Sequence, residues 1–199
     1  MPPVASPRKG DQRKAEILSV ARSLLVDEGY DRFVLREIAA RAGMKLGNLQ
    51  YYFSTRDALL EAVVRTELQS TFATVDANVS NDQDSESQLR EIGRSLIHEW
   101  SGTSGRVYAT LAFLAMHQES FQELHRDVYA QFYEHLMPVL QKLNPKANDI
   151  ALLKPARLIA AVLDGAPFQL ESGTFATMQD SREHFIDDVC DHLVRIATT

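Results

Sequence analysis

The stretch IAARAGMKLGNLQYYF, residues 38–53, decides how the first part of this chain folds. Its apolar residues are spaced as in two short helices, and Gly43 lies between them. Glycine adopts the left-handed backbone of a tight turn without a steric penalty. The sequence therefore predicts two short helices, over residues 35–42 and 45–52, joined by a glycine turn.

The second of these helices separates apolar from polar side chains. Leu46 and Leu49, with Phe53 just beyond the helix, are expected to face a core. The outward set is Lys45, Asn48, Tyr51 and Tyr52, with Gln50 near the edge. Amides and amines suit base edges, and tyrosine hydroxyls suit phosphates, so this helix fits the major groove of DNA. On spacing alone, an ordinary corner of a helical bundle explains the pattern equally well.

Helical periodicity continues on both sides of this pair. A preceding helix is predicted over residues 11–28, with Gly29 as its end, and Ser54 and Thr55 offer an N-cap for a long helix towards Asn78. Further helices are predicted at about 85–100, 104–117, 121–143, 149–171 and 180–197, and Pro138 is expected to kink or split one of them. No segment shows the sustained two-residue alternation of a strand. The predicted fold class is all-α, with about nine helices.

The net charge of −6 is divided unevenly along the chain. Residues 1–56 contain ten basic and six acidic side chains, a local net charge of +4. The remaining residues, 57–199, contain eleven basic and twenty-one acidic side chains, a net charge of −10. Because lysine and arginine dominate binding to phosphates, the basic end is the part expected to meet a polyanion.

Composition excludes several classes of protein. A single cysteine, Cys190, excludes an intrachain disulfide, and it is expected to be a small buried hydrophobe rather than a redox site. No run of eighteen apolar residues and no signal-peptide core occurs, so a cytoplasmic protein without a membrane partner is expected.

Neither a catalytic motif nor a metal motif is evident. The six histidines form no HxxxH or HExxH pattern, and no phosphate-binding glycine loop is present. We therefore expect no enzyme, no catalytic residues, no cofactor and no metal site. Four side chains on the last helix could hold a cation weakly, although a solvated acidic face is the favoured interpretation; they are His184, Asp187, Asp188 and Asp191.

The quoted stretch, followed by Ser54-Thr55-Arg56-Asp57-Ala58-Leu59-Leu60, closely resembles the N-terminal domain of the tetracycline-repressor (TetR) family of bacterial transcription regulators. The resemblance covers about residues 11–62, and beyond it only the architecture matches. It implies a helix-turn-helix domain over residues 1–56, with residues 1–10 as a flexible arm. It also implies that residues 57–199 form a helical domain for ligand binding and dimerisation.

The resemblance also implies roles for individual side chains. Tyr51, Tyr52, Arg56 and Arg36 are expected to hold phosphates, and Lys45, Asn48 and Gln50 are the candidates for base reading. Lys45 stands where a small hydroxyl residue is usual, Gln50 where tyrosine is usual, and Tyr52 where histidine is usual, so the operator sequence of relatives cannot be transferred. Val34 replaces the usual threonine cap of the second helix.

The basic N-terminal segment has two possible roles. Arg8 and Lys9, with Arg13 and Lys14, form either an arm along the DNA or a solvated charged end.

Aromatic side chains accumulate in the acidic remainder of the chain. Any one of them is more often ordinary core, but together they permit a ligand pocket between helices. The resemblance places this pocket among the helices from Thr55 to about Leu143. The candidate lining residues are Trp100, Tyr108, Phe113, His117, Tyr129 and Tyr133.

The last two predicted helices carry wide apolar faces, wider than packing on a single side requires. A homodimer is therefore expected, as in the interface of four helices that is usual in the family. The candidate interface residues are Ile159, Leu163, Phe185, Val189 and Leu193.

Together these features predict a dimeric, ligand-responsive transcription regulator, most often a repressor in this family. Its partners are expected to be a palindromic double-stranded DNA operator, a second copy of the chain and a small-molecule effector. The alternative is a DNA-binding regulator without an effector, whose helical domain only dimerises or docks a protein partner. A cavity of ligand size favours the first hypothesis, and a filled core favours the second.

Overall fold

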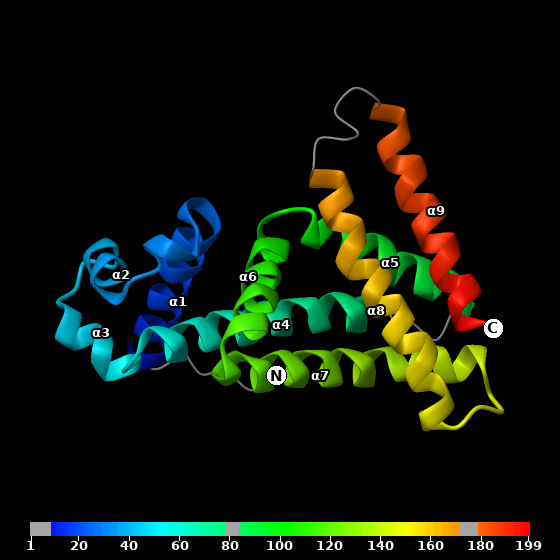
Figure 1. The fold of residues 1–199 in the computed structure, drawn as a ribbon, viewed down its shortest axis with the longest axis horizontal. Helices are drawn as coiled ribbons and strands as arrows, with labels where there is room; N and C mark the ends of the chain where they lie inside the picture. Colours follow the sequence, from blue (N-terminus) through cyan, green and yellow to red (C-terminus); the bar gives the residue numbers. More distant parts are fainter. Residues whose placement is uncertain (1–8, 79–83, 172–178) are drawn as a thin grey trace, which may run out of the picture. The chain divides into compact units, whose positions relative to one another are not determined.

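The computed structural model describes residues 9–78, 84–171 and 179–199, and within these ranges every regular element is a helix (Figure 1). The prediction of an all-α fold is confirmed. The elements are α1 (Lys9–Glu28), a 3₁₀ turn η1 (Tyr30–Arg32), α2 (Leu35–Arg41), α3 (Leu46–Tyr52), α4 (Arg56–Asn78), α5 (Ser85–Trp100), α6 (Thr103–His117), α7 (Glu119–Leu143), α8 (Asp149–Glu171) and α9 (Gln179–Ala197).

The helix boundaries differ from the predicted ones by at most a few residues. The 3₁₀ turn η1 carries too few residues to show a periodicity, and it was not predicted. The helix α7 runs through Pro138 without splitting. The Lys45 backbone is extended, so Lys45 is the N-cap of α3 rather than its first helical residue.

Local signals in the sequence account for the ends of the short helices. Gly43 has a φ of 63°, the left-handed conformation expected for the turn between α2 and α3. The Thr55 hydroxyl accepts a hydrogen bond from the Ala58 amide at 3.1 Å, which caps α4. Val34 caps α2 with no side-chain hydrogen bond, as its apolar side chain dictates.

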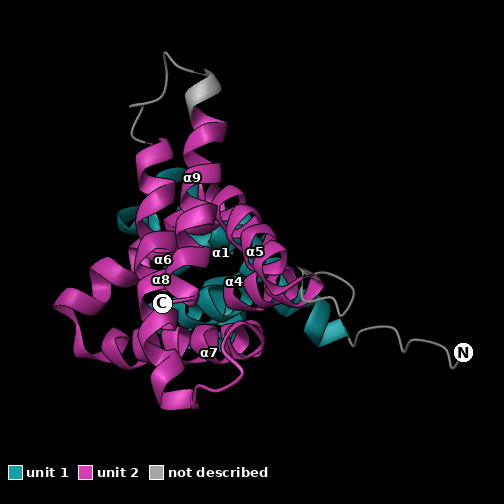
Figure 2. Cartoon of the chain, turned by 90° about the vertical axis from the view of Figure 1, so that its right-hand side faces the viewer, with its two compact units in different colours: residues 1–67 teal, residues 68–199 magenta. Residues whose placement is uncertain are grey.

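The chain divides into two compact units, residues 1–67 and residues 68–199 (Figure 2). In the smaller unit, α2 packs against α1 and α3. The boundary expected between residues 56 and 57 falls at the first turn of α4. The core of the smaller unit consists of fully or almost fully buried side chains, among them Ile17, Leu24, Phe33, Ile38, Leu49, Leu59 and Leu60.

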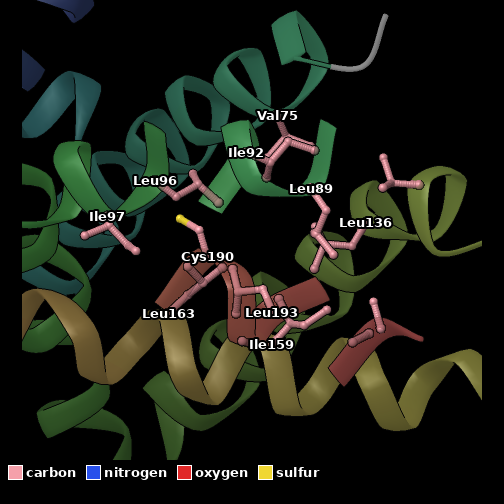
Figure 3. Close-up of a cluster of buried hydrophobic side chains, with 14 of the residues drawn as sticks. Val75, Leu89, Ile92, Leu96, Ile97, Leu136, Ile159, Leu163, Cys190 and Leu193 are labelled. Carbon is pink, nitrogen blue, oxygen red and sulfur yellow. The ribbon is translucent and has the colours of Figure 1, made fainter. Parts of the chain in front are cut away.

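The larger unit is built around one cluster of buried apolar side chains. Figure 3 shows Leu96 of α5, Leu163 of α8 and Leu193 of α9 meeting in this core. Gly93 lies at the close approach of α5 and α9: a Cβ atom there would lie 2.6 Å from Cδ1 of Leu193, so the Leu193 side chain would have to shift. Cys190 is buried in the same cluster, and burial raises the pKa of its thiol to about 11, as expected for a packing residue.

Ion pairs also join α5 to α9. Arg90 Nε lies 2.8 Å from Oδ1 of Asp191, and Arg94 pairs with Asp187 and with Glu183. The Arg90 guanidinium holds the pKa of the Asp191 carboxyl below its usual range. The acidic face of α9 is thus partly occupied by arginines. Among the described residues, no group of three or more metal-ligating side chains converges.

No helix in the described part of the chain is both long and apolar enough to span a bilayer.

Candidate functional site

The exposed face of α3 carries most of the polar side chains predicted to contact DNA. Lys45, Asn48 and Gln50 are exposed, and Tyr51 exposes 85% of its surface. On the opposite face Leu49 is fully buried and Leu46 is half-buried. Because only the apolar face of the seven-residue helix α3 packs against the core, its polar face is available to another molecule.

Tyr52 is placed differently from Tyr51. It is half-buried, and its ring meets the Tyr51 ring edge to face with centroids 5.3 Å apart. Both tyrosines, with Asn48 and Met44, line a shallow hollow that Arg13 of α1 completes. Sequence periodicity does not predict this position of Arg13, because residues 13 and 48 are brought together only by the packing of α1 against the turn before α3.

The basic residues near the N-terminus do not all belong to a flexible arm. Arg13 donates a hydrogen bond to the Ala42 carbonyl at 3.0 Å and pairs with Glu16. Lys14 Nζ lies 5.7 Å from the centre of the Phe53 ring. The structure thus corrects the arm hypothesis for these two residues, since both belong to the helix α1 and their side chains contact the rest of the smaller unit. Arg8 lies outside the described residues.

Two arginines predicted to hold phosphates occupy contrasting environments. Arg56 donates a hydrogen bond to the Tyr30 carbonyl and lies over the Tyr30 ring, with its guanidinium carbon 3.7 Å from the ring centre. One N–H group of the guanidinium is therefore used within the protein, and its Nε is buried without a hydrogen-bond partner. Arg36 of α2 is exposed, and no ion pair holds it or Lys45 within the described ranges. Whether Arg56 also contacts phosphates stays a prediction.

A cavity of about 270 Å³ lies within the larger unit. This is close to the small end of the range of ligand pockets, about 300–1,000 Å³. Its walls come from the C-terminal half of α4 and from α5, α6, α7 and α8. The lining residues are Leu68, Thr71, Trp100, Gly105, Arg106, Tyr108, Ala109, Leu111, Ala112, His125, Val128, Tyr129, Phe132, Asp164, Pro167, Phe168 and Glu171.

Aromatic rings form one side of this cavity. The Trp100 ring lies 5.6 Å from that of Tyr108 and 5.8 Å from that of Phe132, measured between centroids. Thr71 is fully buried, and its hydroxyl shares a hydrogen bond of 2.9 Å with the Tyr108 hydroxyl. The Trp100 indole nitrogen donates a second hydrogen bond to the Thr71 hydroxyl at 3.4 Å. This polar link orders two of the rings.

The charged side of the cavity contains the carboxyl group of Asp164, whose side chain is half-buried. Tyr129 donates a hydrogen bond of 2.5 Å to Oδ2 of Asp164. Burial raises the pKa of Asp164, opposed by that hydrogen bond and by nearby His125. Burial likewise raises the pKa of Tyr129 and lowers that of His125. The ring centroids of His125 and Tyr129 are 4.8 Å apart.

Three of the six predicted pocket residues line this cavity, namely Trp100, Tyr108 and Tyr129. Phe113 and His117 instead lie on the exposed face of α6 with their rings 4.8 Å apart. Tyr133 lines a separate open groove with Arg126 and Arg157.

Sequence reasoning missed the contribution of α8 to the cavity, above all Asp164. The available signal was its position as the one charged residue in the run LIAAVLDGAPF, residues 158–168, because charged side chains are rare among apolar ones unless they have a role. The cavity thus extends beyond Leu143, the predicted limit of the pocket, to residues of α8.

The predicted dimer residues also need revision. Ile159, Leu163 and Leu193 are fully buried in the core of their own chain and have no accessible surface to offer a partner. Phe185 and Val189 are half-buried. The wide apolar faces arise because α8 packs on α7 and on α9. On α8 the accessible apolar surface belongs to other residues, including Leu158, Ala161, Gly165 and Phe168.

Comparison with known proteins agrees with the shape and chemistry of the smaller unit. Residues 17–63 match the family model described as bacterial regulatory proteins, tetR family. The HTH-type transcriptional regulator BetI of Cronobacter sakazakii is 26% identical over 189 residues, which cover 89% of this chain and 94% of the relative.

Solved structures share the fold over nearly the whole chain. A transcriptional regulator from Rhodococcus has a TM-score of 0.76 at 22% identity, covering 94% of this chain and 98% of its own. A transcriptional regulator from Saccharomonospora viridis, solved in complex with choline, has a TM-score of 0.66 at 17% identity. The match covers 92% of this chain and 94% of that regulator.

Proposed function

We propose that this chain is a transcriptional regulator of the TetR family, that it binds a palindromic DNA operator as a homodimer, and that a small molecule in the cavity of the larger unit controls it. The observation that carries this proposal is the cavity of about 270 Å³ lined by aromatic rings and a buried carboxyl group. A protein whose helical domain only dimerised would have no need of that space.

The DNA-binding part of the proposal assigns the reading of bases to the exposed face of α3. Lys45, Asn48 and Gln50 supply the donors and acceptors that distinguish base edges in the major groove. Arg36 and Tyr51, both exposed, are assigned to phosphates. Two copies of α3 then enter successive major grooves, about 34–36 Å apart on one face of the duplex.

The dimer is assigned to the accessible apolar stripe of α8. Leu158 exposes 48% of its surface, and the small residues Ala161 and Gly165 lie one and two turns further along the helix. Small residues allow two helices to approach closely. Leu158→Asp should therefore produce monomers in analytical ultracentrifugation, whereas the control Met116→Asp, at an exposed position on α6, should remain dimeric.

Control by a ligand is assigned to α4, which is continuous between Arg56 and Asn78. Its first half supplies Leu59 and Leu60 to the core of the smaller unit, and its second half supplies Leu68 and Thr71 to the cavity wall. A ligand that fits one position of α4 better than another shifts the separation of the two DNA-reading helices in the dimer. The complex of a neighbour of similar fold with choline supports a small-molecule effector.

A repressor is the form of regulation most usual for this family, and we place its action in the cytoplasm, where bacterial DNA lies. Release of operator DNA by the effector follows from that role.

The test is a DNA-release titration on a selected operator. Small molecules that raise the melting temperature of the protein should displace labelled operator in fluorescence anisotropy. The cavity-filling variant Ala112→Phe should lose this response and keep its operator affinity. Operator binding that no stabilising compound alters, or an unchanged response in Ala112→Phe, would instead favour the regulator without an effector.

A further inference from the structure

We propose that the cavity of the larger unit selects organic cations, with the Asp164 carboxylate as the ionic partner and aromatic rings around the cationic group. This inference rests on the proposed function, because it names the class of ligand that the cavity takes. It is argued from the lining residues alone.

The first argument is the position of Asp164. Its side chain is half-buried, and its hydrogen-bonding partner is the neutral hydroxyl of Tyr129 at 2.5 Å. A neutral partner satisfies one lone pair of the carboxylate without neutralising its charge. Isolated buried charges are costly, so a cation beside Asp164 relieves a penalty that the empty cavity carries.

The second argument is that other charged groups of the lining do not compete for this role. Arg106 and Glu171 line the cavity too, but both are exposed and therefore hydrated. His125 is half-buried, and burial lowers its pKa, which favours the neutral imidazole near pH 7. Among the described lining residues, the interior therefore carries a negative charge and no fixed positive one.

The third argument is the aromatic character of the remaining wall. Trp100, Tyr108, Tyr129, Phe132 and Phe168 all line the cavity. The quadrupole of an aromatic ring attracts a cation, most strongly when water is excluded. An apolar neutral ligand gains from these rings by burial alone, whereas an alkylammonium group gains from burial, from the rings and from the carboxylate.

The raised pKa of Asp164 agrees with this assignment. Its main cause is burial, which disfavours the charged form when the cavity is empty. A bound cation favours the charged form, so binding of the cation should release a proton in the pH range where the empty protein holds Asp164 protonated.

The experiment compares cations with their uncharged analogues of the same shape. The probes are choline against 3,3-dimethylbutan-1-ol and benzyltrimethylammonium against neopentylbenzene, titrated into the full chain by calorimetry. In at least one pair the cation should bind about tenfold or more tightly than its neutral analogue. If neither cation binds more tightly than its analogue, the inference is overturned.

Two variants with the same change in net charge locate the effect. Asp164→Asn keeps the size of the side chain and an acceptor for the Tyr129 hydroxyl, and it should weaken the cation by about tenfold or more while leaving the neutral analogue unchanged. Asp127→Asn is the control, because Asp127 is exposed on α7 and outside the cavity lining. It should change neither ligand's affinity. Equal losses in both variants, or none in Asp164→Asn, would show that Asp164 is not the ionic partner.

Failure of this inference and failure of the proposed function give different results. If a neutral compound binds in the cavity and releases operator DNA, ligand control stands and selection of cations falls. If cations bind with the predicted dependence on Asp164 but no compound affects operator binding, the cation site stands and ligand control falls.

Discussion

The candidate sites of the two units place their polar side chains in opposite ways. In residues 1–67 the apolar side chains fill the interior, and the polar ones of α3 lie on the surface. In residues 68–199, the buried Thr71 and the half-buried Asp164 face a cavity. A duplex is too large to be enclosed and is read from an exposed face, whereas a small ligand is bound tightly only where most of its surface is buried.

The largest effect is expected from truncating a buried aromatic side chain of the smaller unit, compared with truncating an exposed one. Phe33 is fully buried, so Phe33→Ala should lower the free energy of unfolding by about 3–5 kcal/mol. Tyr51 is almost fully exposed, so Tyr51→Ala should change it by about 0.5 kcal/mol or less while weakening DNA binding. Urea unfolding measures the free energy of unfolding of both variants, and fluorescence anisotropy of labelled operator measures their affinity for DNA.

A loss of stability in Tyr51→Ala comparable to that of Phe33→Ala would contradict the division between core and DNA-reading surface.

A somewhat smaller effect is expected at the ion pair that ties α1 to α4. Arg22 pairs with Glu67, whose side chain is 4% exposed. Removing one partner leaves the other buried without its counterion, so Arg22→Ala should lower the free energy of unfolding by about 2–3 kcal/mol. The matched control is Arg65→Ala, which breaks an exposed pair with Glu61 on α4 itself and should cost about 0.5 kcal/mol or less. Similar losses in both variants would show that burial of Glu67 does not matter.

How far the sequence was informative also differs between the two units. The helix-turn-helix could be predicted because its signals are local: Gly43 fixes the turn, Thr55 caps α4, and Leu49 alternates with exposed polar neighbours. The role of Arg56 could not be predicted, because its contact with Tyr30 depends on how distant residues pack. Local periodicity does not report such contacts.

In the larger unit, the sequence predicted the helices, but only three of the six candidate pocket residues line the cavity. Tyr108 and Phe113 both belong to α6, yet Tyr108 lines the cavity and Phe113 is exposed. The difference arises from the rotation of α6 about its axis, which only tertiary packing fixes. Ile159, a predicted interface residue, is fully buried within its own chain. The sequence pattern of an apolar helix face does not show whether the same chain or a partner covers that face.

A base-reading side chain of α3, Asn48, and a phosphate-binding side chain of α2, Arg36, should respond differently to substitution. Asn48→Ala should change the preferred base at one position of each half-site, a discrimination of about 1–3 kcal/mol. Arg36→Ala should weaken all sequences alike and reduce the salt dependence of binding by about one phosphate contact. Binding to a panel of operator variants at several salt concentrations separates the two. A uniform loss in Asn48→Ala would contradict its assignment to bases.

The smallest effect concerns the buried carboxyl group of the larger unit. The pKa of Asp164 is raised in the folded state, so this state binds its proton more tightly than the unfolded chain does. Stability from this group is therefore fully present below the ordinary aspartate pKa, about 4, and is lost as pH rises through the folded pKa. Asp164→Asn removes that loss, so the variant should melt at a higher temperature than the parent at pH 7.

The difference in melting temperature should shrink as the pH is lowered to about 4. A difference that does not change with pH would contradict the burial of a charged Asp164 in the empty cavity.

The central claim is that α3 reads a specific palindromic operator, and selection of bound sequences from random duplex DNA tests it most directly. At low salt the parent protein should enrich one inverted repeat, and Gln50→Ala should enrich the same repeat with a changed base at one position of each half-site. Enrichment of no sequence, or of the same sequence regardless of substitutions on the exposed face of α3, would contradict the claim.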